Sequence, residues 1–239
     1  MRLLVIGGSG HVGSMVLPTL AAEHELRVFD LKPPRSDVAG VEYTGGDIAD
    51  FDALSAAMVD QEALVYMAMG PIGEWGTPRT VAAHFDVAVK GLHLALRAAH
   101  EAGIDHAVFT SSMSVYQEPR DADNPYPDET VPPDCTDFYG LAKRCGEQVC
   151  LSAAAEYGMS VVALRLCHPV PDDQWPPADP GKASIGTSGR DTARAILRGL
   201  GYRGHGFEPF TISGNASGRL LSIEKAGRVL DWAPLDPVA

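Results

Sequence analysis

The chain has 239 residues, of which 45% are hydrophobic, and a formal net charge of −12 at pH 7. This length fits one domain, or one domain with a small appendage, whose folding hides roughly 70% of the surface of the unfolded chain. The acidic balance argues against nucleic acid or an anionic membrane as the main partner, since both require a basic face.

The sequence runs from Met1 almost directly into a short apolar strand, with no secretory pattern and no apolar run of membrane-spanning length. The four cysteines show no paired metal-ligand spacing, and we interpret them as reduced thiols. We therefore expect a cytoplasmic protein without a bound metal ion.

Short apolar runs alternate with helical periods along the chain. The expected strands cover residues 3–6, 26–29, 41–43, 63–67, 106–110 and 161–166. The expected helices cover residues 12–22, 52–58, 80–102 and 138–157. Apolar strands separated by helices indicate an α/β fold with a doubly wound parallel sheet of the Rossmann type, which binds its ligand at the carboxyl ends of the strands.

The later part of the chain departs from this alternation. Residues 117–137 and 168–189 are rich in Pro, Asp or Gly and are expected to form loops above the sheet. Further on, the expected elements are a helix near 191–200, a strand near 210–213 and a helix near 222–230. We interpret residues 1–167 as a ligand-binding domain of the Rossmann type. Residues 168–239 are then a short substrate-binding appendage, a lid rather than an independent domain.

A glycine-rich turn joins the first strand to the first helix. Gly7, Gly10 and Gly13 give the turn its tight bend, its close approach to a pyrophosphate and its helix contact. The phosphates would lie at the positive end of the helix dipole. This arrangement predicts a dinucleotide site at the N-terminus of the chain.

The second strand ends at Asp30, which indicates the kind of dinucleotide. An acid at this position accepts hydrogen bonds from the ribose hydroxyls of the adenosine half and repels a 2′-phosphate, so we expect NAD rather than NADP. Lys32 and Arg35 lie close by and leave NADP as the alternative.

Two further segments follow strands of the predicted sheet. Asp47 and Ile48 are placed to meet the adenine, although Gly46 and Asp47 also suit a plain turn and helix cap. Ala68, Met69 and Gly70 end the fourth strand with mostly small residues, which lets the backbone approach the middle of the cofactor.

The predicted catalytic residues lie on the fifth strand and the following helix. Tyr139 and Lys143 are four residues apart and share one helix face, and Ser112 follows the fifth strand. A free phenol has a pKa of about 10. The Lys143 ammonium and an oxidised nicotinamide would both lower that pKa, so Tyr139 can act as a base while Ser112 holds the substrate oxygen.

Together these residues resemble the extended short-chain dehydrogenase/reductase superfamily, also called the NAD-dependent epimerase/dehydratase family. The resemblance implies a catalytic role for Ser112, Tyr139 and Lys143, and places Ser114 near the substrate. Where the family usually has L-R-x-x-N-P, this chain has His168 before the proline. The implied cofactor contacts are Gly7, Gly10, His11, Val12, Gly13, Asp30, Leu31, Asp47, Ile48, Ala68, Met69, Gly70, Tyr139 and Lys143.

The resemblance also bears on the reaction. Dehydratases of this family carry an acidic pair after the catalytic Ser or Thr, where this chain has Met113 and Ser114, so dehydration is not expected. The short C-terminal region is similar to that of uronate dehydrogenases, which oxidise a hexuronic acid with NAD. Those enzymes carry a carboxylate-binding Arg after the sixth strand, where residues 168–182 offer only Lys182.

We expect an NAD-dependent oxidoreductase acting on a sugar or sugar-acid hydroxyl, with Ser112, Ser114, His168 and Trp75 at the substrate. An NAD-retaining sugar or nucleotide-sugar epimerase and a non-catalytic dinucleotide sensor are the alternatives. The resemblance further implies a homodimer formed through the helices at 80–102 and 138–157. His84 shows no ligand pattern and is expected to be an ordinary surface or core residue.

Overall fold

The computed structural model describes residues 1–118, 120–179 and 184–238. Its centre is a seven-stranded parallel sheet with the order β3-β2-β1-β4-β5-β6-β9. The strands are β1 (Arg2–Ile6), β2 (Glu25–Asp30), β3 (Val41–Gly45), β4 (Ala63–Tyr66), β5 (His106–Ser112), β6 (Ser160–Leu166) and β9 (Gly206–Ile212). The direction of winding reverses between β1 and β4, which creates a crevice outside their carboxyl ends. The predicted doubly wound sheet is confirmed.

Apolar side chains explain why these segments form the centre of the sheet. Leu3 and Val5 of β1 pair in register with Leu26 and Val28 of β2, and all four are buried. A strand covered by helices on both faces reads as a continuous apolar run, as β1 and β4 do. The six expected strands are confirmed, with ends that shift by no more than two residues.

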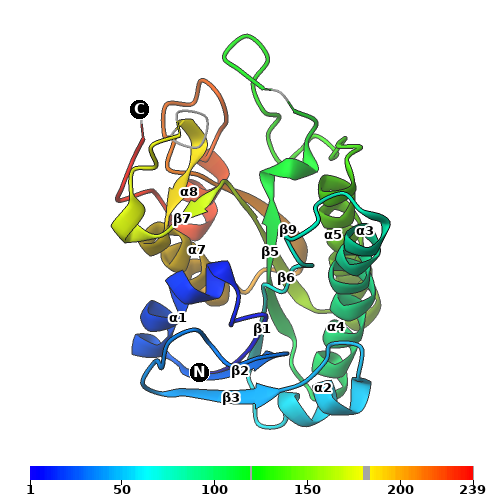
Figure 1. The fold of residues 1–239 in the computed structure, drawn as a ribbon. Coiled ribbons are helices and arrows are strands. Elements are labelled where there is room, and N and C mark those ends of the chain that lie inside the picture. The colour runs from blue at the N-terminus through cyan, green and yellow to red at the C-terminus, as the bar shows by residue number, and fades with distance from the viewer. Residues whose placement is uncertain (119, 180–183, 239) are drawn as a thin grey trace.

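Helices cover both faces of the sheet (Figure 1). One face carries α1 (His11–Glu23), α7 (Gly189–Gly201) and α8 (Glu224–Leu230). The other face carries α2 (Phe51–Met58), α3 (Pro78–Phe85), α4 (Leu92–Glu101) and α5 (Phe138–Tyr157). Each layer buries its own apolar cluster against the sheet, so the strands are shielded from water on both sides.

The helix expected over 80–102 is a helical run whose middle turn is a π-helix, η1 (Asp86–Gly91), between α3 and α4. The carbonyl of Val87 accepts the hydroxyl of Tyr66 at 2.6 Å. A side chain on Gly91 would overlap Ile48 and approach that same hydroxyl. The wider turn therefore follows from packing against β4 and the β3–α2 connection, which helical periodicity does not report.

Part of the region after residue 167, which we expected to be a substrate-binding appendage, completes the main sheet. β9 pairs with β6 along its whole length, from Ser160 opposite Gly206 to Leu166 opposite Ile212, and so completes the sheet. Trp232 is fully buried in the α1–α7 core, and its indole N–H donates to the carbonyl of Asp191 at 3.1 Å. Much of 168–239 is thus part of the main domain, because β6 is buried along nearly its whole length and pairs with β9 on its outer side.

The outer side of β9 is an edge of the sheet. Thr211 directs its backbone N–H away from β6, and the carboxylate of Glu129 accepts it at 2.7 Å. Pro209, two residues earlier on the same side, has no backbone N–H to offer. The loop that carries Glu129 therefore lies against this edge.

Above the carboxyl edge, β7 (Pro169–Val170) and β8 (Thr187–Ser188) form a separate two-stranded sheet. Within the described ranges, no helix is long and apolar enough to cross a membrane. All four cysteines are free thiols.

Candidate active site

The glycine-rich turn between β1 and α1 depends on the absence of side chains at two positions. Gly7 has a φ of +82°, and a Cβ there would lie 2.4 Å from the backbone of Ala68. A Cβ on Gly13 would lie 1.9 Å from the carbonyl oxygen of Gly8. Gly10 caps α1 without a side-chain hydrogen bond, which leaves the first turn, including His11 and Val12, open to an anionic ligand.

Ser9 gives a direct indication that this turn is built for a ligand. Its hydroxyl is buried and is among the side-chain groups in the described part of the chain that find no hydrogen-bond partner. Buried polar groups without partners are rare and call for an explanation such as a ligand. The residues of the turn fit the pyrophosphate of a dinucleotide, and Ser9 is a candidate contact that the sequence analysis missed.

Asp30 lies at the carboxyl end of β2 beside the turn. Its carboxylate accepts the backbone N–H of Ser9 at 3.0 Å, which fixes the acid next to the phosphate cradle. The next residue, Leu31, is largely exposed. An acid held there is placed to meet ribose hydroxyls.

The two other segments of the predicted cofactor site lie at the same edge. Asp47 is exposed and accepts the N–H of Ala49 at 2.9 Å, while Asp50, rather than Asp47, caps α2. Ile48 packs against Gly91 of η1. Ala68 contacts the glycine turn, so the connection after β4 reaches the middle of the cofactor site.

The two serines at the end of β5 face different surroundings. Ser111 donates to the carboxylate of Glu147 at 2.7 Å and belongs to a buried polar network under α5. The hydroxyl of Ser112 accepts the N–H of Ser114 at 3.1 Å and lies near enough to the phenol of Tyr139 to lower its pKa. The structure thus brings Ser112, and not Ser111, to Tyr139.

Tyr139 and Lys143 lie on consecutive turns at the start of α5. Asp137 caps this helix by accepting the N–H groups of Tyr139 and Gly140 at 2.9 and 3.0 Å. Lys143 is 5% exposed, and its ammonium donates to the carbonyl of Thr110 at 2.7 Å. Helix capping and this buried hydrogen bond hold both side chains at the carboxyl edge of the sheet.

The electrostatics of this pair differ from the simple expectation. Burial raises the pKa of the Tyr139 phenol, and the nearby hydroxyl of Ser112 opposes that rise. Burial lowers the pKa of Lys143 to about 8. Without bound cofactor, burial therefore raises the pKa of Tyr139 more than its neighbours lower it, and Tyr139 is a protonated phenol at neutral pH.

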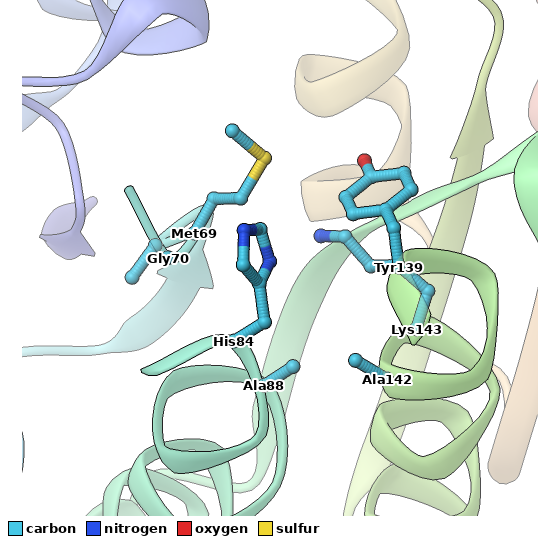
Figure 2. Close-up of a pocket in the computed structure, with 8 residues that line it drawn as sticks. Met69, Gly70, His84, Ala88, Tyr139, Ala142 and Lys143 are labelled. Carbon is cyan, nitrogen blue, oxygen red and sulfur yellow. The ribbon is translucent and has the colours of Figure 1, made fainter. Parts of the chain in front are cut away.

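A pocket beside Tyr139 contains a residue that the sequence analysis had dismissed. Figure 2 shows His84 facing Tyr139 and Lys143 across this pocket. His84 is 2% exposed, so it occupies a core position, which is one of the two kinds of position expected for it. The pocket is lined by Ala68, Met69, Gly70, His84, Ala88, Tyr139, Ala142 and Lys143.

The predicted substrate residues lie in different surroundings. Trp75 is 53% exposed and packs against Tyr139, with ring centroids 5.6 Å apart, so it lies at the mouth of the site. His168 follows β6, is exposed and has a φ of +36°. Its role stays a prediction. Lys182 lies outside the described residues.

Comparisons with known proteins place this site in a family. The sequence profile of the "NAD dependent epimerase/dehydratase family" matches residues 3–181. The chain belongs to this family, as the sequence motifs predicted. The predicted cofactor, NAD, is the one that the family's description names.

Two curated relatives show how varied this family is. An L-arabinose 1-dehydrogenase (NAD(P)(+)) of Haloferax volcanii is 28% identical over 69% of this chain and 66% of the relative. A UDP-glucose 4-epimerase of Azospirillum brasilense is 33% identical over 69% of this chain and 48% of the relative. The matches thus span about half to two thirds of these relatives' length, and the relatives catalyse different reactions.

Solved structures share the fold. A mutant uronate dehydrogenase from Agrobacterium tumefaciens complexed with NAD superimposes with a TM-score of 0.81, at 22% identity. The match covers 99% of this chain and 85% of that one. The predicted similarity to uronate dehydrogenases is therefore confirmed for the fold.

The depressed pKa of Lys143 generates a prediction about stability. The unfolded chain binds this proton more tightly than the folded protein, so the buried ammonium destabilises the fold at neutral pH. We expect Lys143→Met to raise the free energy of unfolding at pH 7 by up to about 3 kcal/mol. The gain should shrink as the pH rises from about 8 to about 10.4, where wild type also loses the charge.

Urea unfolding at a series of pH values measures this difference. Lys90→Met is the matched control, because Lys90 is 56% exposed in its ion pair with Asp86 and should shift stability little. A gain that is absent at pH 7, or that grows with pH, would contradict a destabilising buried ammonium.

Proposed function

We propose that the protein is an NAD-dependent oxidoreductase that transfers hydride between NAD and a hydroxyl-bearing carbon of a sugar or sugar acid, with a uronate-like substrate as the favoured class. The observation that carries this proposal is that Ser112 and Tyr139 lie together beside the buried amine of Lys143, which donates to the carbonyl of Thr110 at 2.7 Å. The nearby glycine turn, with the unpartnered hydroxyl of Ser9, supports a dinucleotide at the same edge of the sheet.

Ser112, Tyr139 and Lys143 can together carry out the oxidation of an alcohol. Bound oxidised NAD would supply the hydride acceptor and a positive charge near Tyr139. Ser112 holds the substrate oxygen, and Tyr139, as phenolate, accepts the hydroxyl proton. Lys143 supplies a cation that favours the phenolate form, and it is positioned to hold a ribose hydroxyl. Burial of the pair excludes water and strengthens these interactions.

The substrate would lie between the catalytic residues and the loops above them. Ser114 directly follows the Ser112–Met113 pair, and Trp75 exposes half of its surface at the mouth of the site, where an indole can stack on a sugar ring. We assign both to the substrate, together with His168 after β6.

An NAD-retaining epimerase is the second candidate, since a curated relative that is 33% identical is a UDP-glucose 4-epimerase. It would use the same Tyr139 and Lys143 but produce no net NADH. A dinucleotide sensor has less support, because both of these side chains are retained in the site, with Lys143 buried and Tyr139 partly buried. The cytoplasmic location stays a prediction.

Loss of the phenol tests the proposed reaction. With NAD and a panel of uronic acids, aldoses and small alcohols, we expect wild type to form NADH and Tyr139→Phe to lower kcat by at least about a hundredfold, because the general base is removed. NADH absorbance measures the rate, and Tyr157→Phe at the far end of α5 should leave it unchanged. Equal rates in wild type and Tyr139→Phe would exclude Tyr139 as the base. If no NADH forms but a nucleotide sugar is isomerised, the epimerase is favoured.

The cofactor preference is tested at Asp30. We expect wild type to use NAD more efficiently than NADP, and Asp30→Asn to raise the NADP/NAD ratio of kcat/KM by about tenfold or more, because the charge that repels a 2′-phosphate is lost. The amide keeps an acceptor for the N–H of Ser9. Asp37→Asn, in the exposed β2–β3 connection, is the control. A wild-type ratio above one would overturn the assignment.

We also propose a homodimer that packs through α4 and α5. Leu141 and Leu151 on α5 are 36% and 46% exposed, which gives the helix an apolar outer surface. Light scattering should give twice the mass of 25.4 kDa. A monomer mass at micromolar concentration would contradict this assembly.

A further inference from the structure

The His84 side chain belongs to α3, outside the Ser112–Tyr139–Lys143 group, yet it faces that group across the pocket (Figure 2). The ring and the Lys143 amine point toward one another in this view. The charge of Lys143 acts on His84, since it contributes to lowering the pKa of the imidazole. Among the residues that line the pocket, the titratable ones are His84, Tyr139 and Lys143.

The protonation of His84 follows from its other contact. Its Nε2 lies 3.2 Å from the carbonyl oxygen of Pro71, and a carbonyl can only accept, so Nε2 carries a hydrogen. Burial lowers the pKa of the ring, which keeps it neutral near pH 7. A neutral imidazole has one N–H, so Nδ1 is left as an acceptor.

The orientation of the ring is tightly constrained. The rings of Trp75 and Phe138 lie at 5.2 and 5.4 Å and nearly perpendicular to it, and the Tyr139 ring lies at 5.8 Å. A Cβ on Gly70 would lie 2.7 Å from the imidazole, so glycine makes room for it. Such a ring offers its Nδ1 lone pair in a fixed direction.

Lys143 has N–H donors available for the Nδ1 acceptor of His84. An ammonium carries three N–H donors, and Lys143 directs one to the carbonyl of Thr110 at 2.7 Å. That carbonyl lies at the end of β5, while His84 lies on the opposite wall of the pocket. The amine is therefore bordered by acceptors on two sides.

We propose that His84 is a positioning residue for Lys143, whose ammonium donates to Nδ1 of the imidazole through one water. This contact fixes the amine beside Tyr139 and favours its charged form. The role of the contact in turnover rests on the proposed function, whereas its existence does not. It also joins the Gly70–Trp75 segment to the catalytic lysine, because Pro71 and Trp75 both hold the same ring.

Nuclear magnetic resonance on the protein without cofactor tests the contact itself. Long-range ¹H–¹⁵N spectra of protein with ¹⁵N-labelled histidine report the tautomer and pKa of each ring, and the signal lost in His84→Phe identifies His84. We expect the neutral Nε2–H form in wild type. Lys143→Met should move the Nδ1 signal and raise the pKa of His84, since a neighbouring cation is removed.

Lys90→Met, on the exposed side of η1, should leave His84 unchanged. An identical Nδ1 signal and titration in wild type and Lys143→Met would overturn the proposal. So would an Nδ1–H tautomer in wild type. Neither result depends on finding a substrate, so this measurement stands even if the proposed reaction is wrong.

Three substitutions at His84 then test its role in turnover. Asn places an amide oxygen near the position of Nδ1, Gln reaches the position of Nε2, and Phe keeps only the aromatic packing. We expect Asn to stay within about threefold of wild-type kcat, and Gln and Phe to lose about tenfold or more with little change in substrate KM, as for a lost hydrogen bond to a charged group.

In the Gln and Phe variants, the Lys143-dependent limb of the kcat–pH profile should also move to lower pH, because the charged amine has lost an acceptor. A purely structural role predicts the opposite pattern. Phe would then preserve kcat and its pH profile, or Asn would be as poor as Phe, and either result would overturn the proposal. If wild type itself forms no NADH, the proposed function fails while the spectra still decide the contact.

Discussion

The geometry of the site depends on one buried ion pair, between Glu147 of α5 and Arg165 of β6. Both side chains are almost completely buried, with N–O distances of 2.7 and 2.9 Å. Removing two charges from water is costly unless every group is paired, and here Ser111 and Tyr116 complete the hydrogen bonding. Glu147 is four residues after Lys143 and eight after Tyr139, so the three share one face of the helix. Fixing Glu147 therefore fixes the rotation of α5 and the direction of both catalytic side chains.

The same network reaches the loop above the site. The hydroxyl of Tyr116 shares its hydrogen between the carbonyls of Asp128 and Val131. These hydrogen bonds connect the loop after β5 to the buried network of Glu147 and Arg165 beneath α5. On the other side of α5, a Cβ on Gly146 would press on the carbonyl of Ala88, and this close approach brings η1 and α3 toward the catalytic residues. The pocket between α3 and α5 is thus a product of tight backbone packing. His84 can only enter it because α5 comes so near.

The sequence predicted those features that local patterns encode. The strands follow from continuous apolar runs, and the cofactor turn follows from glycines at positions where a Cβ would collide with Ala68 or Gly8. Long-range features were not predictable in this way. The membership of β9 in the sheet depends on pairing with β6, and the π-turn at η1 depends on the hydroxyl of Tyr66. His84 was missed because a lone histidine carries no pattern until the fold places it opposite Lys143.

The edge of the sheet has a consequence for the behaviour of the protein at high concentration. A free edge strand is a template on which another chain can add a strand, and that addition leads to aggregation. Along the outer side of β9, Pro209 has no donor and the N–H of Thr211 is already held by Glu129. An incoming strand therefore finds two consecutive outward positions without a free N–H. The loop that carries Glu129 therefore also prevents another chain from adding a strand to this edge of the sheet.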